Sequence, residues 1–155
     1  MNLREHLMDY SLGNHLRLYW WLFRLRERAG GGLWADILTF WLNRIAHKRG
    51  GYIGRGAEIA GIPSLPHGLH GIYISRYASI GAGCRIYQNV TIGEVGGKAP
   101  RIGDGCLIGA NAVLVGGIRV GNGVKIGAGA VVSEDVPAYA TVVAQPPRVL
   151  VREIA

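Results

Sequence analysis

The sequence predicts a mainly β protein, a parallel β-solenoid of six-residue repeats preceded by a short helical segment. Between residues 74 and 132 ten aliphatic residues recur at six-residue steps, with one longer step in the middle. Glycine directly follows six of these ten residues. A small or β-branched residue stands four positions after most of them. A helix would show a period near 3.6 and a half-buried strand a period of 2. Six-residue units cannot bury an apolar face alone, so they stack around a ladder of aliphatic side chains.

The repeat runs in two blocks separated by a gap. Its aliphatic positions are Ile74, Ile80, Ile86, Ile92 and, after the gap, Ile102, Ile108, Leu114, Val120, Ile126 and Val132. Cys84 and Cys106 occupy the small inward position of their repeats. We therefore expect buried structural thiols rather than a metal pair or a disulfide.

The length and the net charge of the chain limit its domain organisation and the kinds of partner that it could bind. The 155 residues suit an N-terminal helical segment over residues 1–50 and a solenoid domain over residues 51–155. The net charge of +7 fits nucleic acid, an anionic membrane or a small polyanionic ligand. No nucleic-acid-binding motif is present, so we expect no nucleic-acid partner. The first residues do not read as a signal peptide, which predicts a cytoplasmic protein with free thiols.

Two interruptions break the six-residue period. Leu65 keeps the period upstream, but Ile74 follows nine residues later, which places three extra residues within 66–71. Ile102 follows Ile92 by ten residues, which places four extra residues within 94–101. We expect both insertions to leave the wall as loops, at different corners of a triangular cross-section, and loops on rigid scaffolds often carry function. A threefold assembly could bring one corner against another corner of a neighbouring copy.

Four segments carry a family resemblance: "LPHGLHGIYIS", "IYQNVTIG", "GGKAPRIGDGCLIGANAVLVGG" and "VKIGAGAVV". Over about residues 45–150 the chain resembles the hexapeptide-repeat acyltransferases, and more closely the serine acetyltransferase-like O-acetyltransferases of polysaccharide biosynthesis. The resemblance implies a left-handed parallel β-helix with three hexapeptides per coil, a homotrimer, and acetyl-CoA bound between subunits. The handedness comes from the resemblance alone, because the period does not define it.

The resemblance also implies that His67 is the catalytic general base. An alcohol is a poor nucleophile until its proton is being removed, and an imidazole can accept that proton near neutral pH. Backbone N–H groups near Gly93 or Ala110 would stabilise the oxyanion. A backbone carbonyl or Tyr52 could orient His67. His70 either pairs with His67, touches substrate, or is an ordinary turn residue.

Four residues depart from the pattern of the serine enzymes of this family. Their catalytic histidine follows an Asp, where this chain has Pro66, and a second Asp fifteen residues earlier is replaced by Tyr52. An Arg-His pair that helps to hold the amino acid is replaced by Lys98 and Ala99, although Lys98 could still bind a carboxylate. We therefore expect the acceptor to be a hydroxyl of a sugar, a nucleotide sugar or a polysaccharide precursor. The alternatives are serine, an antibiotic-type small molecule, and a non-catalytic solenoid scaffold.

Further residues are candidates for binding acetyl-CoA or the acceptor. Lys125 and Arg148 match positions that approach CoA in the family, and Ala110 and Ala128 would leave room for the pantetheine arm. Gln88, with its neighbour Asn89, either lines the site or forms a stacked amide ladder. A zinc-dependent anhydrase on the same solenoid would need three histidines, whereas the repeats and their insertions contain only His67 and His70, so we expect no metal.

The first fifty residues lack the repeat. Leu33, Ile37, Trp41 and Ile45 form an apolar helical stripe, residues 16–25 suggest another short helix, and Gly30–Gly32 separates the two. One interpretation is a helical cap that packs on the first coil and protects its open end. The other is a basic, aromatic surface that rests on anionic lipid at the inner face of the membrane.

Overall fold

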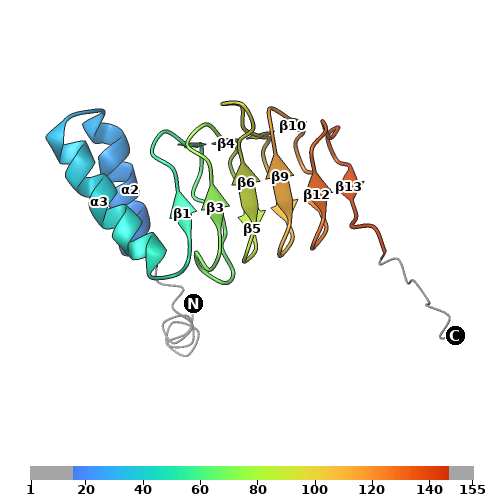
Figure 1. Cartoon of the computed structure of the whole chain (residues 1–155), viewed down its shortest axis with the longest axis horizontal. Helices are drawn as coiled ribbons and strands as arrows, with labels where there is room; N and C mark the ends of the chain where they lie inside the picture. Colours follow the sequence, from blue (N-terminus) through green and yellow to red (C-terminus); the bar gives the residue numbers. More distant parts are fainter. Residues whose placement is uncertain (1–15, 147–155) are drawn as a thin grey trace, which may run out of the picture.

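A computed structural model describes residues 16–146, which form a parallel solenoid with two helices at its N-terminal end (Figure 1). The helices are α2 (Arg17–Ala29) and α3 (Leu33–His47), joined by the predicted glycine break. The strands that follow are two or three residues long and pair only in parallel. The predicted fold class is therefore confirmed.

The strands build three sheets, which we name A, B and C. Sheet A contains, in spatial order, β1 (Tyr52–Ile53), β3 (Tyr73–Ile74), β6 (Thr91–Gly93), β9 (Val113–Val115) and β12 (Val131–Val132). Sheet B contains β2 (Glu58–Ile59), β4 (Ser79–Ile80), β7 (Arg101–Ile102) and β10 (Arg119–Val120). Sheet C contains β5 (Arg85–Ile86), β8 (Leu107–Ile108), β11 (Lys125–Ile126) and β13 (Thr141–Val142).

The chain visits the sheets in the order A, B, C on each coil, so the cross-section has three corners. We name them AB, BC and CA after the sheets that they join. Isolated parallel bridges at Ser64 and Val136 extend sheets C and B where no full strand forms. The first interruption lies at the CA corner and the second at the AB corner. The prediction that they occupy different corners is confirmed.

The interior is the predicted ladder of aliphatic side chains. All ten repeat positions from Ile74 to Val132 are buried, and Cys84 and Cys106 are buried among them as free thiols. Cys84 donates from Sγ to the carbonyl of Gly103 (3.2 Å), and Cys106 donates to that of Gly121 (3.1 Å). Burial raises the pKa of both thiols above the ordinary value. The expected structural role of the cysteines agrees with this geometry.

The helices bury a different stripe from the one that the sequence predicts. Helix α3 packs through Ala35, Leu42 and Ala46, whereas Leu33 is 74% exposed and Trp41 is 54% exposed. Of the predicted stripe, only Ile45 packs against the core. The small alanines allow close approach to α2, so the bulkier stripe faces outward. The predicted stripe is therefore not the face through which α3 packs.

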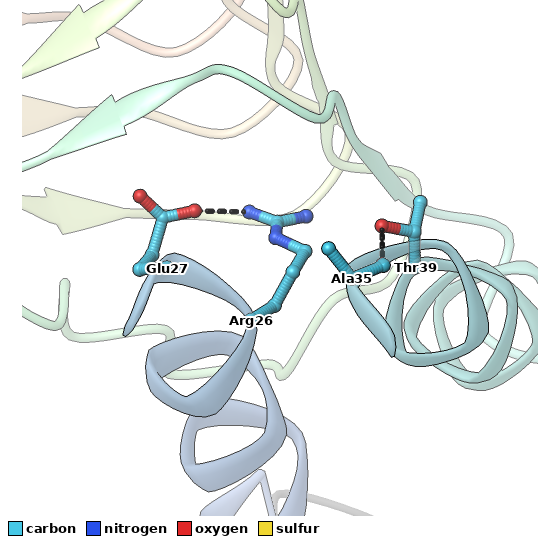
Figure 2. Close-up of polar contacts among 4 residues, drawn as sticks. All are labelled: Arg26, Glu27, Ala35 and Thr39. Atoms are coloured by element: carbon cyan, nitrogen blue, oxygen red, sulfur yellow. Dashed lines mark hydrogen bonds and ion pairs between the residues drawn. The ribbon is translucent and has the colours of Figure 1, made fainter. Parts of the chain in front are cut away.

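Helix α2 holds a buried charge at its C-terminal end. The Arg26 guanidinium is nearly inaccessible, stacks 4.4 Å from the centroid of the Phe23 ring, and forms an ion pair with Glu27 at 2.8 Å (Figure 2). On α3, the Thr39 hydroxyl donates to the Ala35 carbonyl. Burial raises the pKa of the Tyr19 phenol, against the opposing effect of Arg26. Neither described helix is long and apolar enough to cross a bilayer.

Candidate functional site

The first interruption folds into a tight turn at the CA corner instead of a projecting loop. Leu69, in the middle of the turn, is fully buried, and so is Ile72 at its end. The N–H of Gly68 donates to the Leu65 carbonyl, and the N–H of Ile72 donates to the Leu69 carbonyl. The anchored leucine holds the turn against the wall. This corrects the expectation that the insertion leaves the wall.

The two histidines of the turn are both exposed, one on each side of the anchored Leu69. His70 Nδ1 lies 2.5 Å from the backbone carbonyl of His67. Because a carbonyl oxygen only accepts, Nδ1 of His70 carries the proton and donates it. His70 therefore closes the turn that carries His67, so the structure shows a structural role for a residue also predicted to touch substrate.

The ring of His67 has an aromatic neighbour from the next coil. The centroid of the Tyr87 ring lies 6.0 Å from that of His67, with the ring planes tilted by 47°. Tyr52, suggested from sequence as a partner of His67, lies beside His47 with centroids 6.4 Å apart. The tyrosine beside the candidate base is therefore Tyr87, which follows β5 in sheet C.

Backbone hydrogen bonds connect successive coils along the CA corner. Asn89 donates its N–H to the His70 carbonyl (2.9 Å), and Asn111 donates to the Gln88 carbonyl (3.1 Å). One coil further, Gly129 donates to the Ala110 carbonyl (2.8 Å). His70, Gln88 and Ala110 therefore share one column, with steps of roughly 4.8 Å between coils. The structure brings these predicted site residues to one edge of the solenoid.

Of the polar pair Gln88 and Asn89, the structure shows the amide-ladder contact for Asn89. Asn89 Nδ2 donates to Asn111 Oδ1 at 3.1 Å, so Asn89 forms the stacked amide contact. Gln88 Oε1 is buried and has no hydrogen-bond partner within residues 16–146. Buried polar atoms normally have a partner. Gln88 Oε1 therefore lacks the amide partner that Asn89 has.

The candidate CoA contacts lie at the same corner or beside it. Ala110 is half-buried and Ala128 is exposed, and their backbone N–H groups have no hydrogen-bond partner among the described residues. Lys125 is exposed on β11, three residues before Ala128. Unpaired N–H groups beside small side chains, close to a cation, suit an amide-containing arm with phosphates. Arg148 lies outside the described residues.

The second interruption forms a hairpin at the AB corner. Val95 and Lys98 pair in an antiparallel bridge, and Gly96 and Gly97 between them have φ values of 59° and 75°. Two successive positive φ angles are characteristic of a type I′ turn, which glycine adopts without strain. The hairpin projects, with Val95 and Lys98 exposed. This insertion behaves as the sequence predicts.

Lys98 and Gly93 are separated from His67 within one chain. The Lys98 side chain lies over Gly117 and lines a groove of about 530 Å³ that also contains Arg101 and Arg119. Gly93 ends β6, where it pairs with Val115. Because these residues lie at or near the AB corner, they can meet His67 only across the width of sheet A or from another copy.

A shallow groove of about 300 Å³ covers sheet A between the two corners. Tyr52, Tyr73, Thr91 and Glu94 are among its lining residues. Glu94 accepts a hydrogen bond from the Ser75 hydroxyl (3.1 Å), which fixes a carboxylate where the hairpin begins. Residues 16–146 contain no group of three or more His, Cys, Asp or Glu side chains that could hold a metal ion.

Sequence reasoning missed three residues that shape this site. Leu69 lies outside the six-residue register, so its burial gave no periodic signal. Tyr87 precedes Gln88 in "IYQN", but its proximity to His67 depends on how the turn folds. Glu94 opens the second insertion and is an acidic side chain next to a recognised break, a signal that could have identified it.

Comparisons with known proteins agree with this architecture. Residues 99–134 match the family described as bacterial transferase hexapeptide (six repeats). The serine acetyltransferase of Staphylococcus aureus (strain Mu50 / ATCC 700699) is 39% identical over 95 residues, covering 59% of this chain and 44% of that protein. The chain thus spans less than half the length of this relative.

Solved structures give the same result. The crystal structure of Neisseria gonorrhoeae serine acetyltransferase matches with a TM-score of 0.71 at 34% identity, covering 88% of this chain and 55% of that one. Its complex with serine matches with a TM-score of 0.69 at 35% identity, covering 83% and 54%. These relatives are serine acetyltransferases, so they support the alternative acceptor better than the polysaccharide type expected from sequence.

Proposed function

We propose that this protein is an acetyl-CoA-dependent O-acetyltransferase in which His67 is the general base. The observation that carries the proposal is the position of His67, exposed on an anchored turn at one corner of a hexapeptide solenoid, where His70 of the same turn shares a column with Gln88 and Ala110. The serine acetyltransferase relatives support the same class of reaction. The non-catalytic scaffold does not account for an exposed histidine held in this way.

The chemistry assigned to the chain is a proton relay with charge stabilisation. Acetyl-CoA would supply the acetyl group as a thioester. His67 would take the proton of the acceptor hydroxyl as that oxygen bonds to the acetyl carbon, and would return the proton to the departing sulfur as the C–S bond breaks. The unpaired N–H of Ala110 would stabilise the oxyanion, and Lys125 would meet the phosphates. Gly93 is less suited to the oxyanion because it belongs to the sheet A ladder.

We propose serine as the acceptor. The named relatives act on serine, and the AB corner carries both charges that an amino acid requires: Glu94 for the ammonium and Lys98 for the carboxylate. These residues lie a sheet width away from His67, so the proposal includes a homotrimer in which the AB corner of one copy faces the CA corner of its neighbour.

A sugar hydroxyl is the second candidate. Pro66 and Tyr52 leave no carboxylate at the two positions near His67 where serine enzymes of this family carry Asp. A neutral acceptor needs no countercharge, which is the observation that favours it. Glu94 offers a substitute carboxylate, and for that reason serine is preferred.

The test offers acetyl-CoA with serine, nucleotide sugars and oligosaccharides in parallel, with thiol release and product mass as readouts. We expect O-acetylserine, and a loss of about 10²–10⁴ in kcat/KM for His67→Ala. His70→Ala, a variant of the adjacent structural histidine, should lose far less. Acetylated sugar alone would refute the serine assignment, and full activity of a folded His67→Ala variant would refute the base.

A further inference from the structure

We propose that α2 and α3 form a binding surface for anionic membranes, which holds the N-terminal end of the solenoid against a bilayer. Both helices stand beyond β1 at that end of the molecule (Figure 1). The proposal concerns where the protein acts and is independent of the proposed function.

Helix α2 carries apolar residues on both of its faces. Tyr19, Trp20 and Phe23 face the core. Leu18, Trp21 and Leu25 are exposed, and their spacing of three and four residues places them on one stripe of the opposite side. An ordinary surface helix would carry polar residues there. This outward stripe therefore has no role in packing the described fold.

Helix α3 repeats the arrangement on a larger scale. Its outward side exposes two aliphatic and three aromatic residues, opposite the buried Ala35 and Leu42; they are Leu33, Trp34, Ile37, Phe40 and Trp41. Trp34 is 75% exposed. The rings of Phe40 and Trp41 lie edge-on to each other, with their centroids 5.9 Å apart. Exposed apolar side chains gathered in this way mark an interaction site. We call the outward residues of both helices the ridge.

The composition of the ridge favours a bilayer. Three of the four tryptophans of the chain lie on it, and tryptophan concentrates at the boundary between lipid tails and water. A helix that lies in this boundary buries its apolar side and keeps cationic groups beside the headgroups. The described helices are too short to span the membrane, so they would lie along its surface.

Charge selects an anionic surface. Residues 16–50 contain seven Arg or Lys residues against two acidic ones. Both acids are already paired, Glu27 with Arg26 and Asp36 with Arg55. The net positive N-terminal segments of two copies would repel each other, which argues against a second copy of the chain as the partner on the ridge. Anionic headgroups complement them instead.

A groove beside α2 supplies a place for those headgroups. Its volume is about 630 Å³, and Arg17, Arg24 and Arg28 line it together with apolar side chains, including Trp20 and Leu65. A groove lined by both guanidinium groups and apolar side chains suits a phosphate attached to an acyl chain. The chain enters the His67 turn directly after Leu65, so a bilayer bound here would lie beside the CA corner.

The experiment is vesicle flotation of the full chain. We compare phosphatidylcholine vesicles with vesicles in which about a third of the lipid is phosphatidylglycerol. Wild type should float only with the anionic vesicles. The variant Trp34→Ser, Phe40→Ser, Trp41→Ser and the variant Arg17→Gln, Arg24→Gln, Arg28→Gln should each float at least about tenfold less.

The matched control is Val131→Ser with Val143→Ser, which removes two exposed aliphatic residues at the far end of the solenoid and should float like wild type. Circular dichroism and sedimentation velocity accompany every variant. The proposal would be overturned if the wild-type protein stayed in the unbound fraction with anionic vesicles. It would also be overturned if a folded ridge variant floated like wild type. Absence of flotation together with a ridge-dependent change in oligomeric state would identify another copy as the occupant.

Discussion

The two interruptions of the repeat look alike in the sequence but fold in opposite ways. The turn at residues 66–71 packs down, with Leu69 fully buried and the His67 backbone tied by His70. The hairpin at Val95–Lys98 projects, and none of its four residues is buried. Both insertions add only three or four residues to the six-residue period. Length therefore does not decide the outcome.

The inserted side chains decide it. The first insertion contains a leucine that can reach the core, and burying such a side chain contributes about 1.5–3 kcal/mol. The second contains two adjacent glycines that favour a tight reversal and bury nothing. A rigid turn suits a catalytic group that must hold one position, whereas a projecting hairpin suits contact with a neighbouring copy.

Leu69→Ala should have the largest effect on stability. Removing a fully buried leucine leaves a cavity and should lower the free energy of unfolding by about 2–5 kcal/mol. Val95→Ala, on the exposed hairpin, should change it by less than about 0.5 kcal/mol. Urea unfolding measures both variants. Equal effects would mean that the first turn is not anchored by its leucine.

Gly71→Ala tests whether the CA corner is as tight as the contacts indicate. Gly71 has a φ of 64°, and an added Cβ would lie 2.0 Å from Asn89 Oδ1 and 3.1 Å from Asn89 Cα. Gly105→Ala is the matched control, because Gly105 has a φ of 65° with open space around it. The control should lose about 1–2 kcal/mol of unfolding free energy from backbone strain alone.

We expect Gly71→Ala to lose clearly more than that control, and to lose acetyl transfer because the turn that carries His67 must shift. Thermal unfolding and thiol release measured on the same samples give both readouts. The tight corner would be disproved by a Gly71 variant that is as stable and as active as the Gly105 variant.

The buried thiols give a smaller, pH-dependent effect away from both interruptions. Because the folded state raises the thiol pKa of Cys84 and Cys106, it holds these protons more tightly than the unfolded chain does. The stabilisation is complete below the ordinary thiol pKa and is lost as the pH rises above it. The free energy of unfolding should therefore fall between about pH 8 and about pH 10, and fall less in Cys84→Ala, Cys106→Ala. If the unfolding free energy fell equally with pH in wild type and in the double variant, the buried thiols would not be its cause.

Periodicity was enough to predict the solenoid, its core ladder and the two corners, because each depends on where aliphatic residues stand along the chain. It did not predict the fate of the α3 stripe. Leu33, Ile37 and Trp41 have helical spacing, but spacing cannot tell which face packs when a second face contains Ala35, Leu42 and Ala46. The packed face and the exposed apolar stripe lie on opposite sides of the same helix.

The site was predicted in part for a similar reason. Gln88, Ala110 and Ala128 fall at equivalent positions of successive coils, and the first interruption, which carries His67, precedes them at the same corner, so repeat counting brings them to one edge. His70 as a clamp on the turn, and Tyr87 beside His67, depend on side-chain packing within an irregular segment. No period describes such a segment. The handedness of the coil likewise rested on resemblance and not on the spacing.

The central claim is that one site combines His67 of one copy with the AB corner of another. Mixing two impaired variants, His67→Ala and the double variant Glu94→Ala, Lys98→Ala, tests it most directly. In random mixed trimers about a quarter of all sites would combine an intact histidine with an intact corner, so acetyl transfer should return to about a quarter of the wild-type rate. No recovery on mixing, or a fully active Glu94→Ala, Lys98→Ala variant, would contradict the account.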